Sequence, residues 1–341
     1  MPSFCRHNRF ASNCPICSRE EAEKAAPRRT GLRSTGGHVT RKERTTSRTS
    51  RSRSTSNDLR VRRVARAGAD GYGSQLVPGI RATADAERLA EELGFAAGRL
   101  AALAAAPTGL YAEVASLAAS GDYEEATWLA FLIAYVGPLD GEDPWAGIEA
   151  ARTTWASGEL PDLSDVPLGP RTSHAKARGT TTIEAYRAWI ERSGSQRRAF
   201  EGEASWTPAR RFQRVFERLA LKGFSRDARY DLLVTLGRLG VYELSAPSLF
   251  VGGDDETTVA AKRVFGIGDT LLLERRAADL AAACELPLEV LDVGLWNWSR
   301  PPARPLVPGG RATLGAPAAE PDADAYTRAA SALAALSSRA T

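Results

Sequence analysis

The sequence has little that points to a membrane or to secretion. It holds no long apolar run, and no apolar leader follows its first residue. The longest apolar stretch, residues 126–137, is too short to cross a bilayer, which takes about 20 residues. We therefore expect no signal peptide and no membrane contact, a soluble protein in the cytoplasm, and a buried core helix at residues 126–137.

Methionine occurs once and lysine is scarce, since forty of the forty-five basic residues are arginine. Alanine, in contrast, is very abundant. This combination is typical of a high-GC genome, so the abundance of arginine by itself indicates no function.

Charge is unevenly distributed along the chain. Residues 1–66 contain seventeen Lys and Arg against five Asp and Glu, a net charge of +12. Because the whole chain carries +4, the remaining residues carry −8. A basic arm on a mildly acidic body is typical of attraction to the phosphates of nucleic acid, whose counterions are released on binding. A solubilising tail is the alternative.

Composition divides the chain into four segments. Residues 1–20 hold a Cys/His cluster, and residues 21–75 are rich in Arg, Ser, Thr and Gly. The second segment has too few large apolar residues to offset its ordering entropy, so we expect a disordered basic linker. Residues 76–300 should form the helical body, and residues 301–341 a Pro/Gly-rich linker followed by a short helix.

Helical periodicity recurs in the body, and strand alternation does not. Phe212, Val215, Phe216 and Leu219 follow the i, i+3, i+4, i+7 spacing of one apolar helix face. Several arginines, Arg211 among them, should occupy the opposite, exposed surface. The predicted fold class is therefore all-α.

The Cys/His cluster is Cys5, His7, Cys14 and Cys17. Three thiolates and one imidazole suit tetrahedral Zn²⁺, and the C-x2-C spacing at its end is a typical half-site. Four protein ligands leave no open position, so we expect a structural zinc knuckle that folds on binding metal. A redox CxxC pair is the alternative. Cys284, in an Ala-rich helix, is expected to be a small core residue.

Two glycines flanked by apolar residues separate two helical patterns at residues 265–268. This pattern predicts a helix-hairpin-helix, in which the glycines bring bare N–H groups close to a nucleic-acid phosphate. Basic side chains on both sides would grip phosphates without reading sequence. The predicted DNA contacts are Gly266, Gly268, Lys262, Arg263, Arg275 and Arg276.

A carboxylate follows the hairpin by about two dozen residues. In the helix-hairpin-helix DNA glycosylases, which this arrangement resembles, such a carboxylate stabilises charge on the sugar or activates a nucleophile. Asp292 is thus the first catalytic candidate, expected at the N-terminus of a helix that also carries Trp296 and Trp298. We expect these two rings in the core, and stacking on an extruded base is the alternative. Schiff-base chemistry is not expected, because the position of the lysine used by bifunctional glycosylases falls near Thr270.

A competing alignment takes residues 221–225 as the hairpin, although Ser225 replaces its second glycine. Asp255 would then hold the catalytic position. Otherwise Asp255 is the N-cap or a first-turn acid of a helix that begins near Glu256. His174, in a Pro/Gly/Ser-rich loop without an evident partner, is expected at the surface.

Several short pieces of the body also match a family pattern: residues 186–189 (YRAW), 210–212 (RRF), 218–221 (RLAL), 236–240 (LGRLG), 260–269 (AAKRVFGIGD) and 295–298 (LWNW). Through them residues 181–298 resemble the α-glutamyl/putrescinyl thymine pyrophosphorylase family, in particular its third clade. The resemblance implies a glycosylase-like enzyme on DNA, in which an amine displaces pyrophosphate from a modified 5-hydroxymethyluracil. Such a reaction needs an extruded base, cations for the leaving pyrophosphate and a general base. The Arg and Lys residues near the hairpin would supply the cations, and Asp292 or Asp255 would be the base.

Three functions therefore compete. The first is this base-modifying transferase, with a small amine as second substrate. The second is a monofunctional DNA glycosylase that activates water through an Asp. The third is a non-catalytic DNA-binding protein that uses the hairpin, the arm and the zinc knuckle. The sequence leaves the choice of base, the amine and the oligomeric state open.

Overall fold

The computed structural model describes residues 67–140, 143–300 and 320–334, which belong to one compact unit. In these residues the chain forms twelve α-helices and no strand, which confirms the all-α prediction there. The predicted zinc ligands Cys5, His7, Cys14 and Cys17 lie outside the described residues. The helices are α2 (Thr83–Ala105), α3 (Gly109–Ala119), α4 (Tyr123–Val136), α5 (Ala146–Ala150), α6 (Thr181–Ser193), α7 (Gln196–Glu201), α8 (Pro208–Arg218), α9 (Arg226–Arg238), α10 (Glu256–Phe265), α11 (Thr270–Ala283), α12 (Leu288–Ser299) and α13 (Ala323–Ala334).

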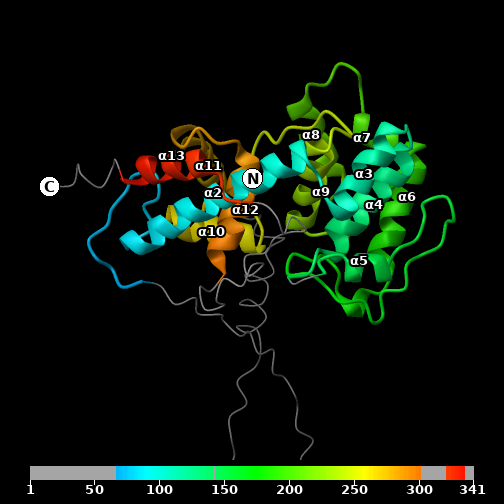
Figure 1. Ribbon diagram of the computed structural model, residues 1–341, viewed down its shortest axis with the longest axis horizontal. Helices are drawn as coiled ribbons and strands as arrows, with labels where there is room; N and C mark the ends of the chain where they lie inside the picture. Colours follow the sequence, from blue (N-terminus) through cyan, green and yellow to red (C-terminus); the bar gives the residue numbers. More distant parts are fainter. Residues whose placement is uncertain (1–66, 141–142, 301–319, 335–341) are drawn as a thin grey trace, which may run out of the picture. The chain divides into compact units, whose positions relative to one another are not determined.

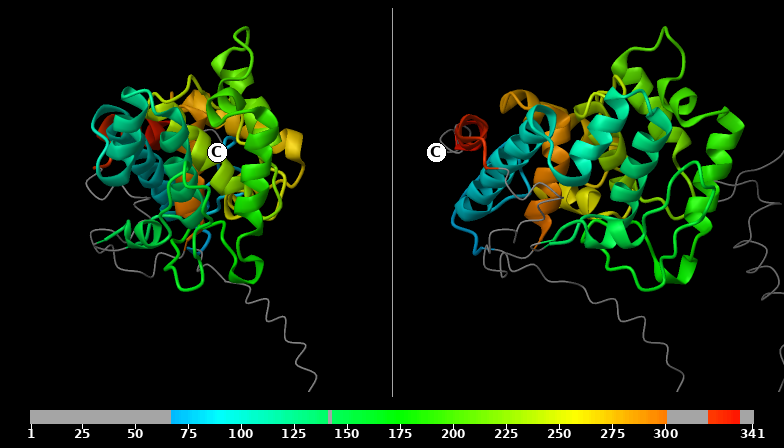
Figure 2. Two further views of the ribbon diagram at one scale, coloured as in Figure 1. Left: turned by 90° about the vertical axis from the view of Figure 1, so that its right-hand side faces the viewer. Right: turned by 45° about the vertical axis from the view of Figure 1, so that its right-hand side comes forward.

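The helices pack in two groups (Figures 1 and 2). In the terminal group α2 packs against α12 and α13, and α10 packs against α11 and α12. In the central group α4 contacts α3, α5, α7 and α9, while α8 packs against α7 and α9. Contacts between α2 and α9 join the groups. The terminal group thus brings together segments from both ends of the described chain.

The predicted core helix at residues 126–137 is α4. Every residue from Ala126 to Val136 is buried, and the side chain of Asp122 caps the helix by accepting from the N–H of Glu125. Aromatic rings surround it, and those of Phe131 and Tyr186 stack with centroids 3.9 Å apart. Because α4 is buried all round, its sequence shows no polar face. The expectation of a core helix is confirmed.

The amphipathic pattern at residues 212–219 is α8, with one correction. Phe212, Val215 and Phe216 face the core as predicted. Arg211, however, is buried rather than exposed, because its guanidinium donates to the carbonyl oxygens of Glu201 (2.7 Å) and Glu243 (2.9 Å). A charged side chain can enter the interior when it satisfies several carbonyls at once.

Helix α13 docks on α2, where two glycines allow close approach. A Cβ at Gly98 would lie 1.9 Å from the carbonyl oxygen of Glu320, and one at Gly94 would lie 2.9 Å from Cβ of Tyr326. The hydroxyl of Tyr72 donates to the carbonyl of Leu333 (3.1 Å), so residues before α2 also contact α13.

By length and composition no single described helix meets the requirements for a bilayer span, although α2 and α3 meet them as a pair bent by 40°.

Candidate functional site

Asp292 lies in the second turn of α12, not at its N-terminus as the sequence suggested, because the helix begins four residues earlier at Leu288. Its side chain is 1% exposed. Trp296 and Trp298 are buried on the same helix, as predicted. The carboxylate of Asp292 therefore lies inside the protein and needs partners there.

Two arginines from distant parts of the chain supply those partners. One carboxylate oxygen of Asp292 accepts from Nη2 of Arg171 (2.9 Å), and the other accepts from Nη1 of Arg226. Arg171 also binds Asp231 through Nε (2.8 Å) and Nη2 (3.1 Å). Arg226 also binds Asp227 (3.2 Å) and the carbonyl of Leu249. We call Arg171, Arg226, Asp227, Asp231 and Asp292 the ion network.

The carboxylates of the ion network differ in their affinity for protons. Burial alone would raise the pKa of Asp292, but Arg226 and Arg171 hold that pKa below its ordinary value. For Asp227, burial raises the pKa to about 6 against the opposing effect of the same arginines. Asp227 Oδ2 has no hydrogen bond within the described residues, whereas both oxygens of Asp292 are bonded. Asp292 thus anchors two cations, whereas burial favours the protonated forms of Asp227 and Asp231 by raising the pKa of each.

The segment that carries Arg171 is fixed against α4 and α9. Ser173 Oγ donates to the carbonyl of Gly223 (2.8 Å) and accepts from the N–H of Ser225 (2.7 Å). The next residue, His174, is buried, and its Nδ1 lies 3.0 Å from the hydroxyl of Tyr135. The expectation that His174 is a surface residue without a partner is therefore wrong. Burial lowers the pKa of His174, so the ring stays neutral at neutral pH.

Asp255 is the N-cap of α10. Its Oδ1 accepts from the N–H of Thr258 (2.8 Å), and its Oδ2 accepts from the hydroxyl of the same residue (2.8 Å). Asp255 also lies close enough to Asp227 to help raise its pKa. The capping interpretation of Asp255 is thus confirmed, and the side chain stands beside the ion network.

A pocket of about 410 Å³ adjoins the ion network. Pro170, on its wall, precedes the network residue Arg171, and Trp296 follows Asp292 by one helical turn. The guanidinium carbons of Arg171 and Arg300 lie 5.1 and 4.7 Å from the Trp296 ring centroid. We call this space the cleft pocket, because loop residues that follow α4 and α5 line it on one side and residues of α10 and α12 on the other. Its lining residues are Leu139, Asp140, Leu168, Pro170, Glu256, Trp296 and Arg300.

The cleft pocket is polar at its rim. Arg300 forms an ion pair with Asp140 (3.3 Å). Glu256, at the first position of α10, has no hydrogen bond or ion pair within the part of the chain that the structure describes. The pocket therefore offers a small polar ligand one cation and an unpaired carboxylate, while the buried Trp296 ring is covered by the guanidinium groups of Arg171 and Arg300.

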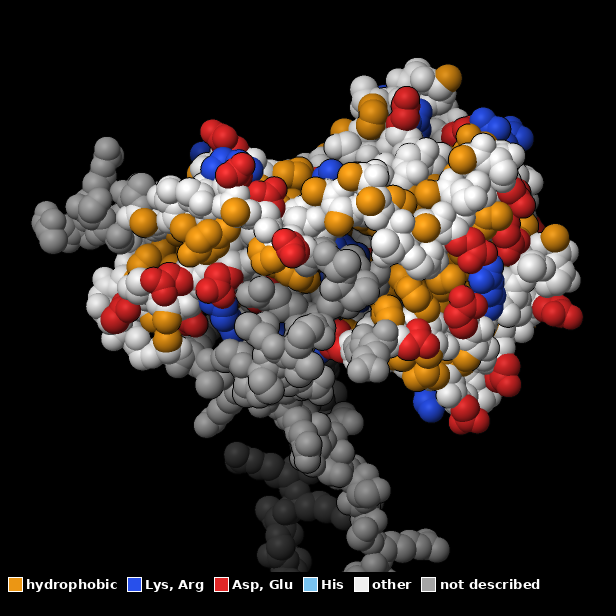
Figure 3. Space-filling view, viewed as in Figure 1, with side chains coloured by type: hydrophobic (Ala, Val, Ile, Leu, Met, Phe, Trp, Pro, Cys, Tyr) orange, Lys and Arg blue, Asp and Glu red, His pale blue; other side chains and the backbone are white. Residues whose placement is uncertain are grey.

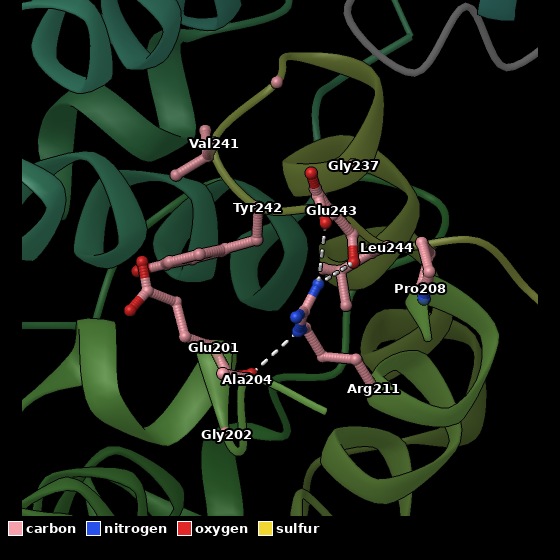
Figure 4. Close-up of a pocket in the computed structure, with 11 residues that line it drawn as sticks. Glu201, Gly202, Ala204, Pro208, Arg211, Gly237, Val241, Tyr242, Glu243 and Leu244 are labelled. Carbon is pink, nitrogen blue, oxygen red and sulfur yellow. Dashed lines mark hydrogen bonds and ion pairs between the residues drawn. The ribbon is translucent and has the colours of Figure 1, made fainter. Parts of the chain in front are cut away.

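A second pocket, of about 690 Å³, lies between α7, α8 and the end of α9. Figure 4 shows the guanidinium of Arg211 turned toward Glu243 within this pocket. Arg211 is held by carbonyl oxygens, as described above, and by the Glu243 carboxylate (3.4 Å). Tyr242 makes its hydrogen bond to Thr127 (2.7 Å). Because these groups are already hydrogen-bonded within the protein, the pocket offers few free polar groups to a ligand.

The predicted hairpin glycines lie in the turn between α10 and α11. Gly266 ends α10 in the left-handed region (φ 63°) and packs against Gly79. The N–H of Gly79 donates to the carbonyl oxygen of Val264 (2.9 Å). Gly268 is exposed, and a Cβ there would meet nothing within 4 Å. The N–H groups of residues 268–271 have no hydrogen-bond partner within the described chain. Such amides at a helix N-terminus favour an anion.

The basic side chains predicted to contact DNA surround this turn, but some of them are already bonded to other parts of the protein. Lys262 donates to the carbonyl of Gly253 (3.2 Å), and Arg276 donates to that of Gln75 (2.6 Å). Arg263 and Arg275 form no ion pair within the described residues. Acidic and basic side chains are interspersed on the face seen in Figure 3, which shows no broad basic field. Cationic attraction at the turn thus comes from a few side chains.

The structure brings together residues that local patterns did not single out. No sequence motif contains Arg171, Arg226, Asp227 or Asp231. They are recognised as a group only in the folded structure, where the two arginines bind Asp292 and each binds one further aspartate. Adjacent opposite charges at 226–227, before an apolar helical pattern, are the one signal in the sequence. No group of His, Cys, Asp and Glu in the described residues is arranged to hold a metal ion.

Comparison with known proteins gives one match. Residues 170–306 match the family model for alpha-glutamyl/putrescinyl thymine pyrophosphorylase, clade 3, so the resemblance read from the sequence is confirmed over this span. No curated protein and no solved structure matches the chain. The matched span contains the whole ion network and the turn between α10 and α11.

Proposed function

We propose that this protein modifies bases in DNA, replacing a pyrophosphate on the 5-methylene carbon of a thymine-type base by an amine. The observation that carries the proposal is the family match over residues 170–306. That span includes the ion network and four residues of the cleft pocket: Pro170, Glu256, Trp296 and Arg300. DNA and a small amine are the substrates.

We place the target base in the cleft pocket. An enzyme reaches a base inside duplex DNA by extruding it into a pocket where it stacks on apolar or aromatic groups. The volume of about 410 Å³ leaves room for a pyrimidine ring and a second small substrate beside the apolar side chains of Leu139, Leu168 and Pro170. Arg300, at the rim, is positioned to offset the charge of the leaving pyrophosphate.

In the reaction the amine nitrogen forms a bond to the exocyclic methylene carbon. The bond from that carbon to the pyrophosphate oxygen breaks, and its electron pair leaves with the pyrophosphate. Glu256 accepts the proton that the amine loses, since it lines the pocket and is unpaired. The two carboxylates singled out from the sequence act by position: Asp292 holds Arg171 and Arg226, and Asp255 fixes the first turn of α10, where Glu256 lies.

The turn between α10 and α11 holds the duplex. Its unpaired amides, with Arg263 and Arg275, bind phosphates of one strand, and the basic arm at residues 1–66 adds attraction that depends on salt. Such a DNA substrate agrees with a protein that acts in the cytoplasm.

The test is a reaction of the full-length protein with duplex DNA that carries 5-(pyrophosphoryloxymethyl)uracil, with putrescine or glutamate as the amine. Mass spectrometry of the digested nucleosides detects the aminated base, and a coupled assay detects released pyrophosphate. We expect both products from the wild type. We expect Glu256→Gln to lower the rate at least about tenfold, because general bases contribute roughly 10²–10⁴, and Glu217→Gln, an exposed change on α8, to leave it unchanged.

Other outcomes identify the competing functions. Free base with alkali-labile sites indicates a glycosylase. Binding without any chemical change to the DNA indicates a binding protein, and either result contradicts the transferase proposal.

A further inference from the structure

Two adjacent leucines at the start of α11 stand out on the surface. Leu271 is 80% exposed and Leu272 is 45% exposed, and they are the most exposed large apolar side chains among the described residues. The next residue, Leu273, is fully buried. The first turn of α11 thus presents an apolar tip that α11 does not need for its own packing.

This apolar tip borders the turn that carries the unpaired amides. The N–H groups of residues 268–271 are without partners in the described chain, so the backbone beside Leu271 is open to acceptors. Arg275 follows Leu271 by one helical turn, is exposed and forms no ion pair there. Asp269 is the acidic neighbour, and its carboxylate accepts from the N–H of Leu272 (3.0 Å).

The tip is too small for a protein partner. A stable protein interface buries about 1,200–2,000 Å² in total, far more than two leucine side chains provide. Unpaired donors and a cation at the edge of an apolar tip instead match the minor groove of DNA. There phosphates accept the donors, and apolar side chains enter between base steps.

We propose that Leu271, supported by Leu272, is a wedge that enters between two base pairs when the turn binds duplex DNA. The inference deepens the proposed function and rests on DNA as the substrate. Partial unstacking by the wedge lowers the cost of extruding a base into the cleft pocket.

The experiment uses the full-length protein and a duplex with 2-aminopurine at a pyrimidine–purine step, a site of easy deformation. Fluorescence reports unstacking, and anisotropy of a labelled duplex reports affinity at one fixed salt concentration. The variants are Leu271→Ser and Leu271→Met, with Leu160→Ser as the matched control, since Leu160 is a leucine 41% exposed outside the turn. Thermal melts confirm folding, which an 80% exposed residue should not alter.

We expect wild-type binding to raise the fluorescence, and Leu271→Met and Leu160→Ser to behave alike. We expect Leu271→Ser to abolish most of the fluorescence rise. We also expect it to bind the duplex about tenfold more weakly, equivalent to ~1.4 kcal/mol. An unchanged rise with Leu271→Ser overturns the wedge while leaving DNA binding intact. A wild type that does not bind DNA overturns the proposed function as well. A dimer that Leu271→Ser dissociates, seen by light scattering, assigns the tip to a second copy and also overturns the wedge.

Discussion

The carboxylate of Asp292 accepts a hydrogen bond of 2.9 Å from Arg171, and each side chain is only 1% exposed. Because removing two charges from water is costly, such a pair is a weak source of net stability by itself. Loss of one partner is different, since the other charge is then left buried without compensation. The ion network therefore makes strong predictions for single substitutions.

Asp292→Asn should destabilise the protein by about 3–5 kcal/mol, the usual cost of breaking a buried ion pair on one side. Two arginines lose a charged acceptor at once, so the upper part of that range applies. Urea unfolding followed by circular dichroism measures the free energy of unfolding. The control is Glu149→Gln, which removes an ion pair with Arg152 whose side chains are 48% and 34% exposed, and should cost about 1 kcal/mol or less. Equal effects for the two variants would contradict the ion network.

Asp227 should make stability depend on pH between about 4 and 6. Its pKa is raised from 3.8 to about 6 by burial, so the folded protein binds a proton there that the unfolded chain has released. The corresponding stability is fully present below pH 4 and is lost as the pH rises through 6. As the pH falls from 7 to 4, the free energy of unfolding of the wild type should rise by of the order of 2–3 kcal/mol relative to that of Asp227→Asn, at 1.36 kcal/mol per pKa unit. Unfolding free energies of both proteins across this range measure the difference, and parallel curves would disprove it.

Gly268→Ala separates DNA binding from folding. The residue is exposed, its φ is not positive and a Cβ there has open space, so the melting temperature should not change. The added methyl group should instead hinder a phosphate from reaching the neighbouring amides. Loss of one hydrogen bond to a charged group, about 1.5 kcal/mol, weakens duplex binding roughly tenfold. Gly73→Ala is the matched control, because its Cβ also meets nothing within 4 Å. Equal affinities for the two variants would remove the turn from the DNA interface.

The predicted zinc knuckle is testable by metal analysis. We expect about one zinc ion per purified full-length chain, bound by Cys5, His7, Cys14 and Cys17. The double variant Cys14→Ser/Cys17→Ser should lose it, as should wild type treated with a strong chelator. Cys284→Ala should retain it, because Cys284 is buried and burial raises the pKa of its thiol to about 11. Metal that survives in the double variant would rule out this ligand set.

Local features of the fold follow from the sequence because a helix bonds to itself over a few residues. The apolar spacing at Phe212, Val215 and Phe216 predicts α8, and Asp255 is recognisable as a helix N-cap beside Glu256. The left-handed Gly266 at the end of α10 has the same local origin.

Only the tertiary structure decided what the predicted site residues do. Arg171 is 121 positions from Asp292, and Arg226 is 66. No spacing rule connects residues so far apart, since their meeting depends on where the tertiary fold places α9, α12 and the loop that carries Arg171. His174 was misjudged for the same reason: its partner Tyr135 lies on α4, 39 positions away. The sequence by itself determined which segments form helices, because the hydrogen bonds and the apolar periodicity of a helix are both short-range. The packing of one helix group on the other determined which charges are buried, and therefore which carboxylates have arginine partners.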